Sequence, residues 1–158
     1  MIDLSQKIAV VSGGATLIGE KIAEAFVNSG AKVIVADIND EDGNKLADKL
    51  GDNVHFIKTD ITSDENIDSC ISESIAHFGG IDFLINVACT YLDNGADSSR
   101  DEWLTALNTN VIGAAIFTQK VTPQMKKRGG GAVVNFGSIS GKRAQPGRML
   151  YATSKAAI

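Results

Sequence analysis

The sequence is poor in the residues that build disulfide frameworks and metal centres. Among its 158 residues there are only two cysteines and two histidines. Cys70 and Cys89 do not form a CxxC pair, and neither belongs to a spacing typical of zinc ligands. We therefore expect neither a disulfide framework nor a metal site, and chemistry that depends on a metal is not predicted.

The sequence also lacks strong charge of one sign and long apolar runs. The net charge is -4 and there is no basic stripe, which argues against nucleic acid as a partner. No apolar run approaches the length that a membrane span needs, and the first residues, MIDLSQK, lack the features of a signal peptide. These absences predict a cytoplasmic protein without a membrane partner.

What the sequence does contain is a regular alternation of apolar runs and amphipathic segments. Hydrophobic residues make up 44% and charged residues 22%, as in globular proteins, and the length suits one domain over residues 1–158. No repeat or linker interrupts the pattern. Strands are expected at 8–11, 54–58, 81–88, 132–136 and in the run that ends at residue 37, and helices at 40–50, 63–78, from 99 to a kink or end at Pro123, and from 151 to 158. This predicts a doubly wound parallel sheet between two helical layers, with right-handed crossovers.

A glycine-rich turn follows the first predicted strand. Gly13 allows a sharp turn, and Gly19 allows the next helix to pack close to the sheet. The backbone N–H groups of residues 15–18 would then face an anion at the amino end of that helix. The segment indicates a site for the pyrophosphate of a dinucleotide, and a glycine-rich turn without a ligand is the alternative.

Asp37, at the end of the second strand, predicts which dinucleotide binds. Its carboxylate is placed to accept hydrogen bonds from the adenosine ribose hydroxyls and would repel a 2′-phosphate. Neither Thr16 nor the residues after Asp37, Ile38 and Asn39, offer a cation to balance such a phosphate. NAD is therefore expected in preference to NADP.

Several polar residues at predicted strand ends and on an apolar helical face have two interpretations. Asp60 is placed to bind the amine of an adenine, or it caps the next helix, as Ser63 also would. Asn86 either bonds neighbouring main chain or lines the crevice at the carboxyl ends of the strands. Asn110 lies on an apolar stripe, where most polar residues are structural hydrogen-bonding groups.

Tyr151 and Lys155 lie one helical turn apart on the same predicted face. An ammonium about 4 Å from the phenol, at an effective dielectric constant near 20, would favour the phenolate by roughly 4 kcal/mol, or about three pKa units. The pKa of Tyr151 would then approach 7, where an acid-base catalyst works best. Ser138 is placed to hold the substrate oxygen. A buried aromatic residue beside a solvated lysine is the alternative.

Together these motifs resemble the short-chain dehydrogenase/reductase family. The segment from Ser12 to Gly19 looks like the TGxxxGIG loop of that family, and Asn86 to Cys89 is similar to its NNAG segment. Tyr151 to Lys155 fits its YxxxK motif, with Ser138 at the usual serine spacing upstream. The motifs agree in order and spacing over essentially the whole chain.

The resemblance implies a role for each matching residue. Tyr151 would be the general acid/base, Lys155 would lower its pKa and bond the nicotinamide ribose, Ser138 would orient the substrate, and Asn110 would support a proton-relay water. The residues that the resemblance and the glycine loop assign to the cofactor are Gly13, Thr16, Leu17, Ile18, Gly19, Asp37, Asp60, Ile61, Asn86, Ala88, Tyr151 and Lys155.

Three residues depart from the family pattern. Leu17 occupies a glycine position of the loop, where its side chain either crowds the pyrophosphate or points into the core. Val87 and Cys89 replace an asparagine and a glycine near the cofactor. Cys89 is interpreted as a small buried hydrophobic residue rather than a reactive thiol.

The resemblance predicts an NAD-dependent oxidoreductase that transfers hydride between the cofactor and a secondary alcohol or ketone. It also implies a homotetramer or homodimer, with contacts through the helices that start at Ser99 and Tyr151. Family members continue beyond the position of Ile158 through further strands and a substrate lid, so we expect the sequence to be part of a longer protein. A non-catalytic dinucleotide-binding or sensor domain and an NAD-free structural protein are the alternatives.

Overall fold

A computed structural model describes residues 2–143 and 145–158. Its centre is a sheet of five parallel strands in the order β3-β2-β1-β4-β5. The strands are β1 (Ile8–Ser12), β2 (Lys32–Asp37), β3 (Val54–Lys58), β4 (Phe83–Asn86) and β5 (Ala132–Asn135). The predicted parallel α/β sheet is confirmed, although β4 is shorter than the apolar run at 81–88.

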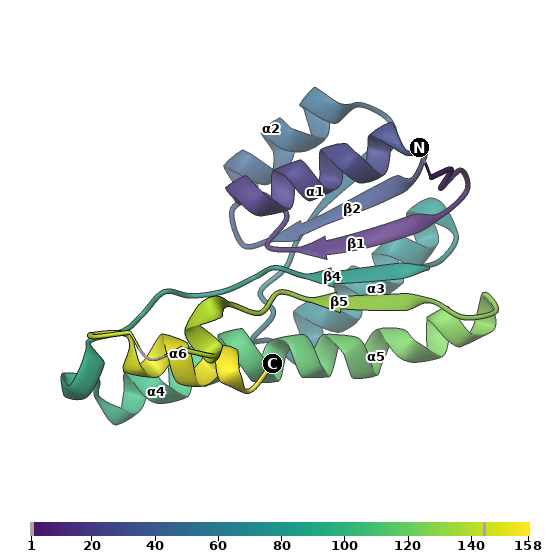
Figure 1. Ribbon diagram of the computed structural model, residues 1–158. Coiled ribbons are helices and arrows are strands. Elements are labelled where there is room, and N and C mark those ends of the chain that lie inside the picture. The colour runs from purple at the N-terminus through teal and green to yellow at the C-terminus, as the bar shows by residue number, and fades with distance from the viewer. Residues whose placement is uncertain (1, 144) are drawn as a thin grey trace.

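Helices cover both faces of this sheet (Figure 1). On one face α1 (Leu17–Asn28) and α2 (Asp40–Leu50) pack over a core that includes Val11, Ala23 and Leu46. On the other face α3 (Asp64–Phe78) and α5 (Ala114–Lys127) pack over a core that includes Ile67 and Phe117. The alternation of side chains along β1 supplies both cores, since Val10 enters the second and its neighbours enter the first. The result is the predicted three-layer architecture.

The shorter elements gather beyond the carboxyl ends of β4 and β5 (Figure 1). They are the 3-10 turns η1 (Gly95–Asp97) and η3 (Ile139–Gly141), helix α4 (Arg100–Leu107), the π-helical turn η2 (Asn108–Gly113) and helix α6 (Met149–Ala156). Parallel strands bring all carboxyl ends to one edge of the sheet, and this edge is where α/β proteins of this type bind ligands.

The helix starts follow the capping signals in the sequence. Ser99 and Glu102 form a reciprocal capping box at α4, as predicted. Ser63 caps α3, because its hydroxyl accepts a hydrogen bond from the backbone N–H of Asn66. Asp60 does not cap that helix: its carboxylate accepts hydrogen bonds from the backbone N–H and the hydroxyl of Thr62.

The helical stretch predicted from Ser99 to Pro123 is present but differs in two respects. It contains a six-residue π-helical turn, η2, between α4 and α5, and α5 continues past Pro123 to Lys127. Pro123 removes one backbone hydrogen bond, but Val121 and Met125 on either side of it are buried against the sheet. Packing therefore holds the helix together where its local sequence favours an end.

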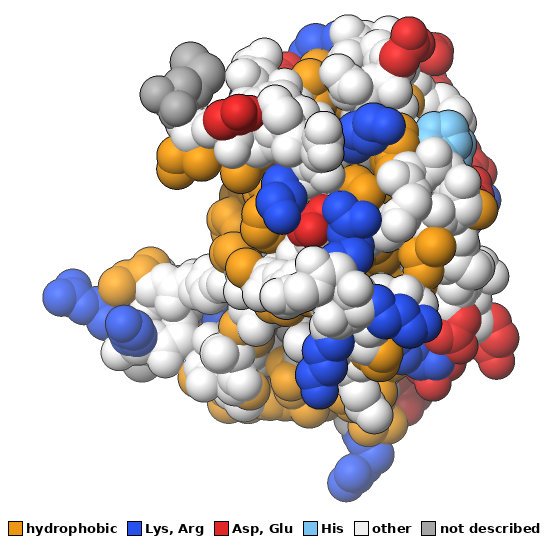
Figure 2. Space-filling model, turned by 90° about the vertical axis from the view of Figure 1, so that its right-hand side faces the viewer, with side chains coloured by type: hydrophobic (Ala, Val, Ile, Leu, Met, Phe, Trp, Pro, Cys, Tyr) orange, Lys and Arg blue, Asp and Glu red, His pale blue; other side chains and the backbone are white. Residues whose placement is uncertain are grey.

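The amino end of the sheet is closed by an ion-pair cluster. Asp82, just before β4, is 3% exposed, and its carboxylate accepts hydrogen bonds from the backbone N–H of Ile8 at 2.9 Å and from Arg128 at 3.1 and 3.0 Å. Lys7 lies 3.6 Å from the same carboxylate. This end of the molecule faces the viewer in Figure 2, where Lys and Arg side chains gather around a small acidic patch.

Within the described ranges, no helix has both the length and the apolar character needed to cross a membrane.

Candidate active site

Two adjoining cavities lie at the carboxyl edge of the sheet. The first cavity, about 430 Å³, extends from the start of α1 to α6, and the second, about 590 Å³, extends along the ends of β2 and β3. Thr16, Cys89 and Tyr91 line both, so the cavities meet at these residues. Together they form a continuous groove from the acid at the end of β2 to the predicted catalytic residues on α6.

The glycine-rich loop forms one wall of this groove. Gly13 has a positive φ of 68°, and a Cβ at this position would lie 2.6 Å from the backbone N of Ala88. A Cβ on Gly19 would lie 2.2 Å from the carbonyl oxygen of Gly13. Both glycines are required by close backbone packing, as the sequence predicted. Thr16 caps α1, since its hydroxyl accepts a hydrogen bond from the backbone N–H of Gly19.

The backbone N–H groups of the loop are only partly free for an anion. Ala15 donates to the carboxylate of Asp37 at 3.0 Å, and Thr16 donates to the carbonyl oxygen of Gly13 at 3.2 Å. Two of the four N–H groups expected to face a pyrophosphate therefore already have partners within the chain, and the role of this loop toward a ligand stays a prediction. Leu17 and Ile18 lie in the first turn of α1, where backbone N–H groups have no partner within the helix, and their role toward a pyrophosphate stays a prediction.

Leu17 does not point into the core. Its side chain is 85% exposed, lines the first cavity together with Ile18, and lies at the mouth of the groove. The leucine side chain, at a position where the family pattern has glycine, thus forms part of the cavity surface.

Asp37 lies in the second cavity at the end of β2. It is 8% exposed, and its two carboxylate oxygens accept hydrogen bonds from the backbone N–H groups of Ala15 and Asn39. Each carboxylate oxygen retains a further lone pair for hydroxyl donors. The other predicted cofactor residues that line this cavity are Gly13, Thr16, Asp60, Ile61 and Ala88.

Asn86 lines neither cavity. Its amide nitrogen donates to the side chain of Asn135 at 2.9 Å and of Thr118 at 3.3 Å, and its amide oxygen accepts from Ser12 at 3.5 Å. These bonds tie β4 to β1, β5 and α5. These bonds agree with the structural interpretation of Asn86, and its assignment to the cofactor stays a prediction.

Three contacts fix α6, the helix that contains Tyr151 and Lys155. Asp93 accepts a hydrogen bond from the backbone N–H of Tyr151 at 2.6 Å, and the amide nitrogen of Asn110 donates to the hydroxyl of Ser154 at 3.0 Å. The ammonium of Lys155 donates to the carbonyl oxygen of Phe136 at 2.7 Å.

Asn110 lies in the π-helical turn and is 2% exposed. Its amide oxygen accepts from the backbone N–H of Thr90 at 2.7 Å, and its amide nitrogen donates to the carbonyl oxygen of Thr90 at 3.0 Å. Its side chain therefore joins the loop after β4 to α6, and a role toward a relay water stays a prediction. π-Helical turns occur frequently at functional sites, because the extra residue redirects side chains.

The chemistry of Tyr151 differs from the sequence-based estimate. Burial raises the pKa of its phenol above the usual value, the Ser138 side chain is the largest opposing influence, and the Arg148 guanidinium also lowers it. Lys155 is not among the main influences on this pKa. The expected shift toward neutral pH through Lys155 is therefore not found.

Ser138 stands next to this pair at the end of β5. Its hydroxyl accepts a hydrogen bond from the backbone N–H of Ser140, and with Lys155 it borders a separate shallow hollow. Cys89 is half-buried, and burial raises the pKa of its thiol although Lys155 opposes the shift. The Lys155 ammonium lies near this thiol, but desolvation has the larger effect and the neutral thiol form is favoured.

Tyr91 and Arg148 were missed by sequence reasoning. The ring of Tyr91 stacks on that of Tyr151 with centroids 5.4 Å apart, and the guanidinium carbon of Arg148 lies 5.7 Å from the Tyr151 ring centroid. Neither residue belongs to a recognised motif. The only feature of the sequence that could have indicated them is their position, Tyr91 after β4 and Arg148 just before α6. The further cavity-lining residues outside the predicted set are Ile38, Thr59, Thr62, Val87, Thr90, Thr105, Thr109, Phe136 and Gly137.

The fold and the site define a parallel α/β protein with a groove and a Ser, Tyr and Lys set at the carboxyl edge of its sheet. The model of the short chain dehydrogenase family matches residues 7–158. The chain belongs to this family of oxidoreductases, and the resemblance seen in the sequence is confirmed.

Named relatives agree with this assignment. An uncharacterized oxidoreductase of Staphylococcus aureus is 36% identical over 160 residues, which cover 100% of this chain and 69% of the relative. Another, from Thermotoga maritima, is 31% identical over 159 residues, which cover 98% of this chain and 62% of the relative. A solved structure of 7 alpha-hydroxysteroid dehydrogenase, in complex with NADH and 7-oxo glycochenodeoxycholic acid, matches with a TM-score of 0.93 and 31% identity. The match covers 98% of this chain and 62% of that structure.

Proposed function

We propose that this protein is an NAD-dependent oxidoreductase that interconverts a secondary alcohol and a ketone. The observation that supports this most strongly is the continuous groove. At one end it has Asp37, at its centre the glycine loop, and at the other end Tyr151 and Lys155. A binding module without chemistry has no use for an acid/base tyrosine beside its ligand.

The residues of the groove fit the parts of a dinucleotide. In this proposal Asp37 binds the adenosine ribose, Asp60 and Ile61 border the adenine, and the N–H groups of Leu17 and Ile18 bind the pyrophosphate. Asp37 is buried without a neighbouring cation among its contacts, so a 2′-phosphate beside it would meet uncompensated repulsion. NAD is therefore proposed in preference to NADP.

When bound, NAD supplies the acceptor for the hydride that leaves the carbinol carbon with the electron pair of its C–H bond. In the proposal the phenolate form of Tyr151 takes the hydroxyl proton as the C–H bond of the alcohol breaks, and becomes the neutral phenol; in the reverse direction the neutral phenol gives this proton to the ketone oxygen. Ser138 donates a hydrogen bond to the same oxygen and Lys155 stabilises negative charge that develops on it. Burial favours the neutral phenol, which is the form needed to protonate a ketone.

The first test is a calorimetric titration with NAD and NADP side by side. NAD is expected to bind at least tenfold more tightly, and Asp37→Asn should reduce this ratio by about tenfold, since loss of the charge removes the repulsion toward a 2′-phosphate. Asp48→Asn, an exposed acid of α2, is the matched control and should leave the ratio unchanged. Absence of binding to either dinucleotide would overturn the proposal.

Turnover separates an enzyme from a binding or sensor domain. Reduction of NAD by secondary alcohols, followed by the absorbance of the reduced cofactor, is expected from the enzyme. Tight NAD binding without turnover on a broad set of alcohols and ketones would instead favour the sensor. We also propose self-association through α4 and α6 as dimer or tetramer contacts, which sedimentation analysis would test.

A further inference from the structure

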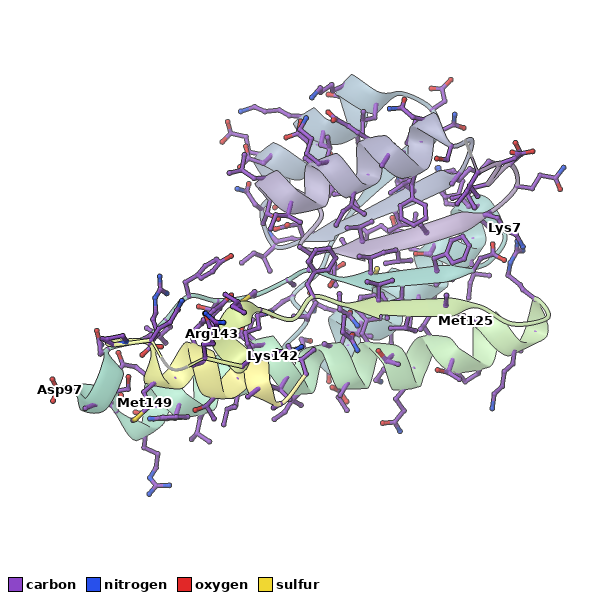
Figure 3. The ribbon with its side chains drawn as sticks, in the orientation of Figure 1. Lys7, Asp97, Met125, Lys142, Arg143 and Met149 are labelled. Carbon is purple, nitrogen blue, oxygen red and sulfur yellow. The ribbon has the colours of Figure 1, made fainter. Side chains whose placement is uncertain are left out.

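The segment between β5 and α6 concentrates positive charge at one end of the groove. Residues 137–149 contain Lys142, Arg143 and Arg148 and no acidic residue, although the chain as a whole has a net charge of -4. Turn η3 of this segment packs against α6. Figure 3 shows Lys142 and Arg143 extending from this segment beside α6. The charge of this segment is thus opposite in sign to the net charge of the protein.

Arg148 is the member of this group that reaches the predicted acid/base. Its guanidinium carbon lies 5.7 Å from the ring centroid of Tyr151, a distance typical of a cation over an aromatic face. Tyr91 stacks on the same ring and lines both cavities. Arg148 lines neither cavity, but its guanidinium and the Tyr91 ring both lie beside the Tyr151 ring, close to where an oxygen that meets the phenol would be.

The donors of Arg148 are not committed to a carboxylate. Among the described residues, no acidic oxygen lies within 4.0 Å of its guanidinium. The charge of Arg148 is one of the weaker influences that lower the pKa of Asp93. The two carboxylate oxygens of Asp93 accept hydrogen bonds from the backbone N–H groups of Tyr151 at 2.6 Å and Gly95 at 2.8 Å. Asp93 is thus occupied in holding α6, while the planar fork of Arg148 stays available to a ligand.

We propose that the substrate of this site carries a negatively charged group, a carboxylate in its simplest form, which Arg148 binds while the reacting oxygen meets Tyr151. This inference rests on the function proposed above and names its substrate class: secondary hydroxy acids and the corresponding oxo acids. A guanidinium fork binds a carboxylate in a fixed orientation, and this orientation places the carbinol against the phenol. Lys142 and Arg143 add attraction at longer range.

The test compares acids with their methyl esters, which have the same carbinol but no charge. The probes are 3-hydroxybutanoate, 4-hydroxypentanoate and 5-hydroxyhexanoate, because the series varies the distance from carboxylate to carbinol. For at least one spacer the acid is expected to exceed its ester at least tenfold in kcat/KM. Equal use of acid and ester at every spacer would overturn the proposal.

Variants locate the effect. Arg148→Gln should lower kcat/KM for the preferred acid at least tenfold, mainly through KM, and change that for the ester less than threefold. Arg148→Lys should restore part of the loss, since it keeps the charge without the fork. Lys127 is an exposed cation at the far end of α5, and Lys127→Gln is the control for net charge. It should change kcat/KM for neither the acid nor the ester. Equal losses for acid and ester in Arg148→Gln would mean that Arg148 supports Tyr151 alone, and would overturn the substrate class.

A binding measurement separates this proposal from the activity on which it rests. Calorimetric titration with the preferred acid and its ester needs no turnover: the wild type should bind the acid at least tenfold more tightly, and Arg148→Gln should abolish the difference. If NAD binds and neutral alcohols are oxidised but acid and ester bind alike, only the substrate class fails. If NAD does not bind, the proposed function fails, and the acid and ester titrations still decide the preference for an anion.

Discussion

The two ends of the parallel sheet use buried polar groups in opposite ways. At the amino end, Asp82 is held by the backbone of Ile8 and by two donors of Arg128, with Lys7 nearby. At the carboxyl end, Asp37 accepts two backbone hydrogen bonds and lies in the wall of a cavity. Both carboxylates are nearly inaccessible in the sheet, but the first is surrounded by protein donors and the second adjoins an open groove.

The cations at the two ends, Lys155 and Arg128, show the same contrast. Lys155 is 8% exposed and donates to one backbone carbonyl, which leaves donor capacity in a cavity wall. The arginine of the amino-end cluster spreads its donors over Asp82, Gly79 and Gln6. The comparison teaches that burial of a charged residue does not by itself indicate function. What distinguishes the two ends is whether the chain itself provides all the partners.

The largest expected effect is at the carboxyl end. Tyr151→Phe should reduce kcat about a thousandfold or more, because it removes the group that exchanges the proton. The dissociation constant of NAD, measured by calorimetry, should change less than about threefold, since the ring and its stacking remain.

Tyr91→Phe is the matched control for this variant. It removes a phenol from the same stacked pair and should retain most of the turnover. Substantial residual activity in Tyr151→Phe, or an equal loss in both variants, would refute the role of Tyr151.

A smaller effect, on stability rather than activity, is expected at the amino end. Arg128→Met should lower the free energy of unfolding by about 2 kcal/mol, since Asp82 loses two charged hydrogen bonds while it remains buried. NAD affinity should stay the same. Urea denaturation measures the change.

Lys45→Gln provides the comparison for an exposed ion pair. Lys45 lies 2.6 Å from Glu41, and both side chains are largely exposed. The loss should stay within about 0.5 kcal/mol. If both substitutions cost the same, the cluster at Asp82 is not a structural clamp.

The smallest effect concerns acid stability. Burial of Asp82 is the largest single influence and raises its pKa, but the combined hydrogen bonds from Arg128 and Ile8 and the charges of Arg128 and Lys7 bring it below the usual value. A carboxyl with a lower pKa in the folded state contributes stability above its unfolded pKa of about 4, and this contribution is lost as pH falls through the folded value.

Asp82→Asn should therefore lower the unfolding free energy more at pH 7 than at pH 3. Urea denaturation at both pH values tests this. A difference from the wild type that stays constant between them would contradict the assignment.

Much of the local structure and one wall of the site were predictable from sequence. The strand at 54–58 and the helix at 40–50 match the predicted bounds, because apolar alternation and capping residues act over a few neighbouring positions. Gly13 and Gly19 were identified because a backbone in close contact or with positive φ leaves no space for a Cβ. The order and spacing of the motifs were enough to predict the family.

The predictions from sequence failed where contacts between segments far apart in the sequence determine the local structure or the surroundings of a side chain. The π-helical turn at Asn110 forms beside bonds to Thr90 and Ser154, which no helical pattern can reveal. From its spacing on one helix, Lys155 was expected to lower the pKa of the Tyr151 phenol, but burial raises that pKa, and the ammonium donates a hydrogen bond to the carbonyl of Phe136. Tyr91 and Arg148 come to Tyr151 from separate segments.

The sequence by itself determined the strand and helix alternation, the glycine loop and the identity of the candidate catalytic residues, since these depend on periodicity, chain geometry and residue type. Only the tertiary structure decided which polar groups are satisfied by the chain and which face a cavity. The physical reason is that hydrogen-bond partners, desolvation and charge proximity are set by contacts between elements far apart in the sequence, and these contacts determine whether a buried charge stabilises the fold or stays available for a ligand.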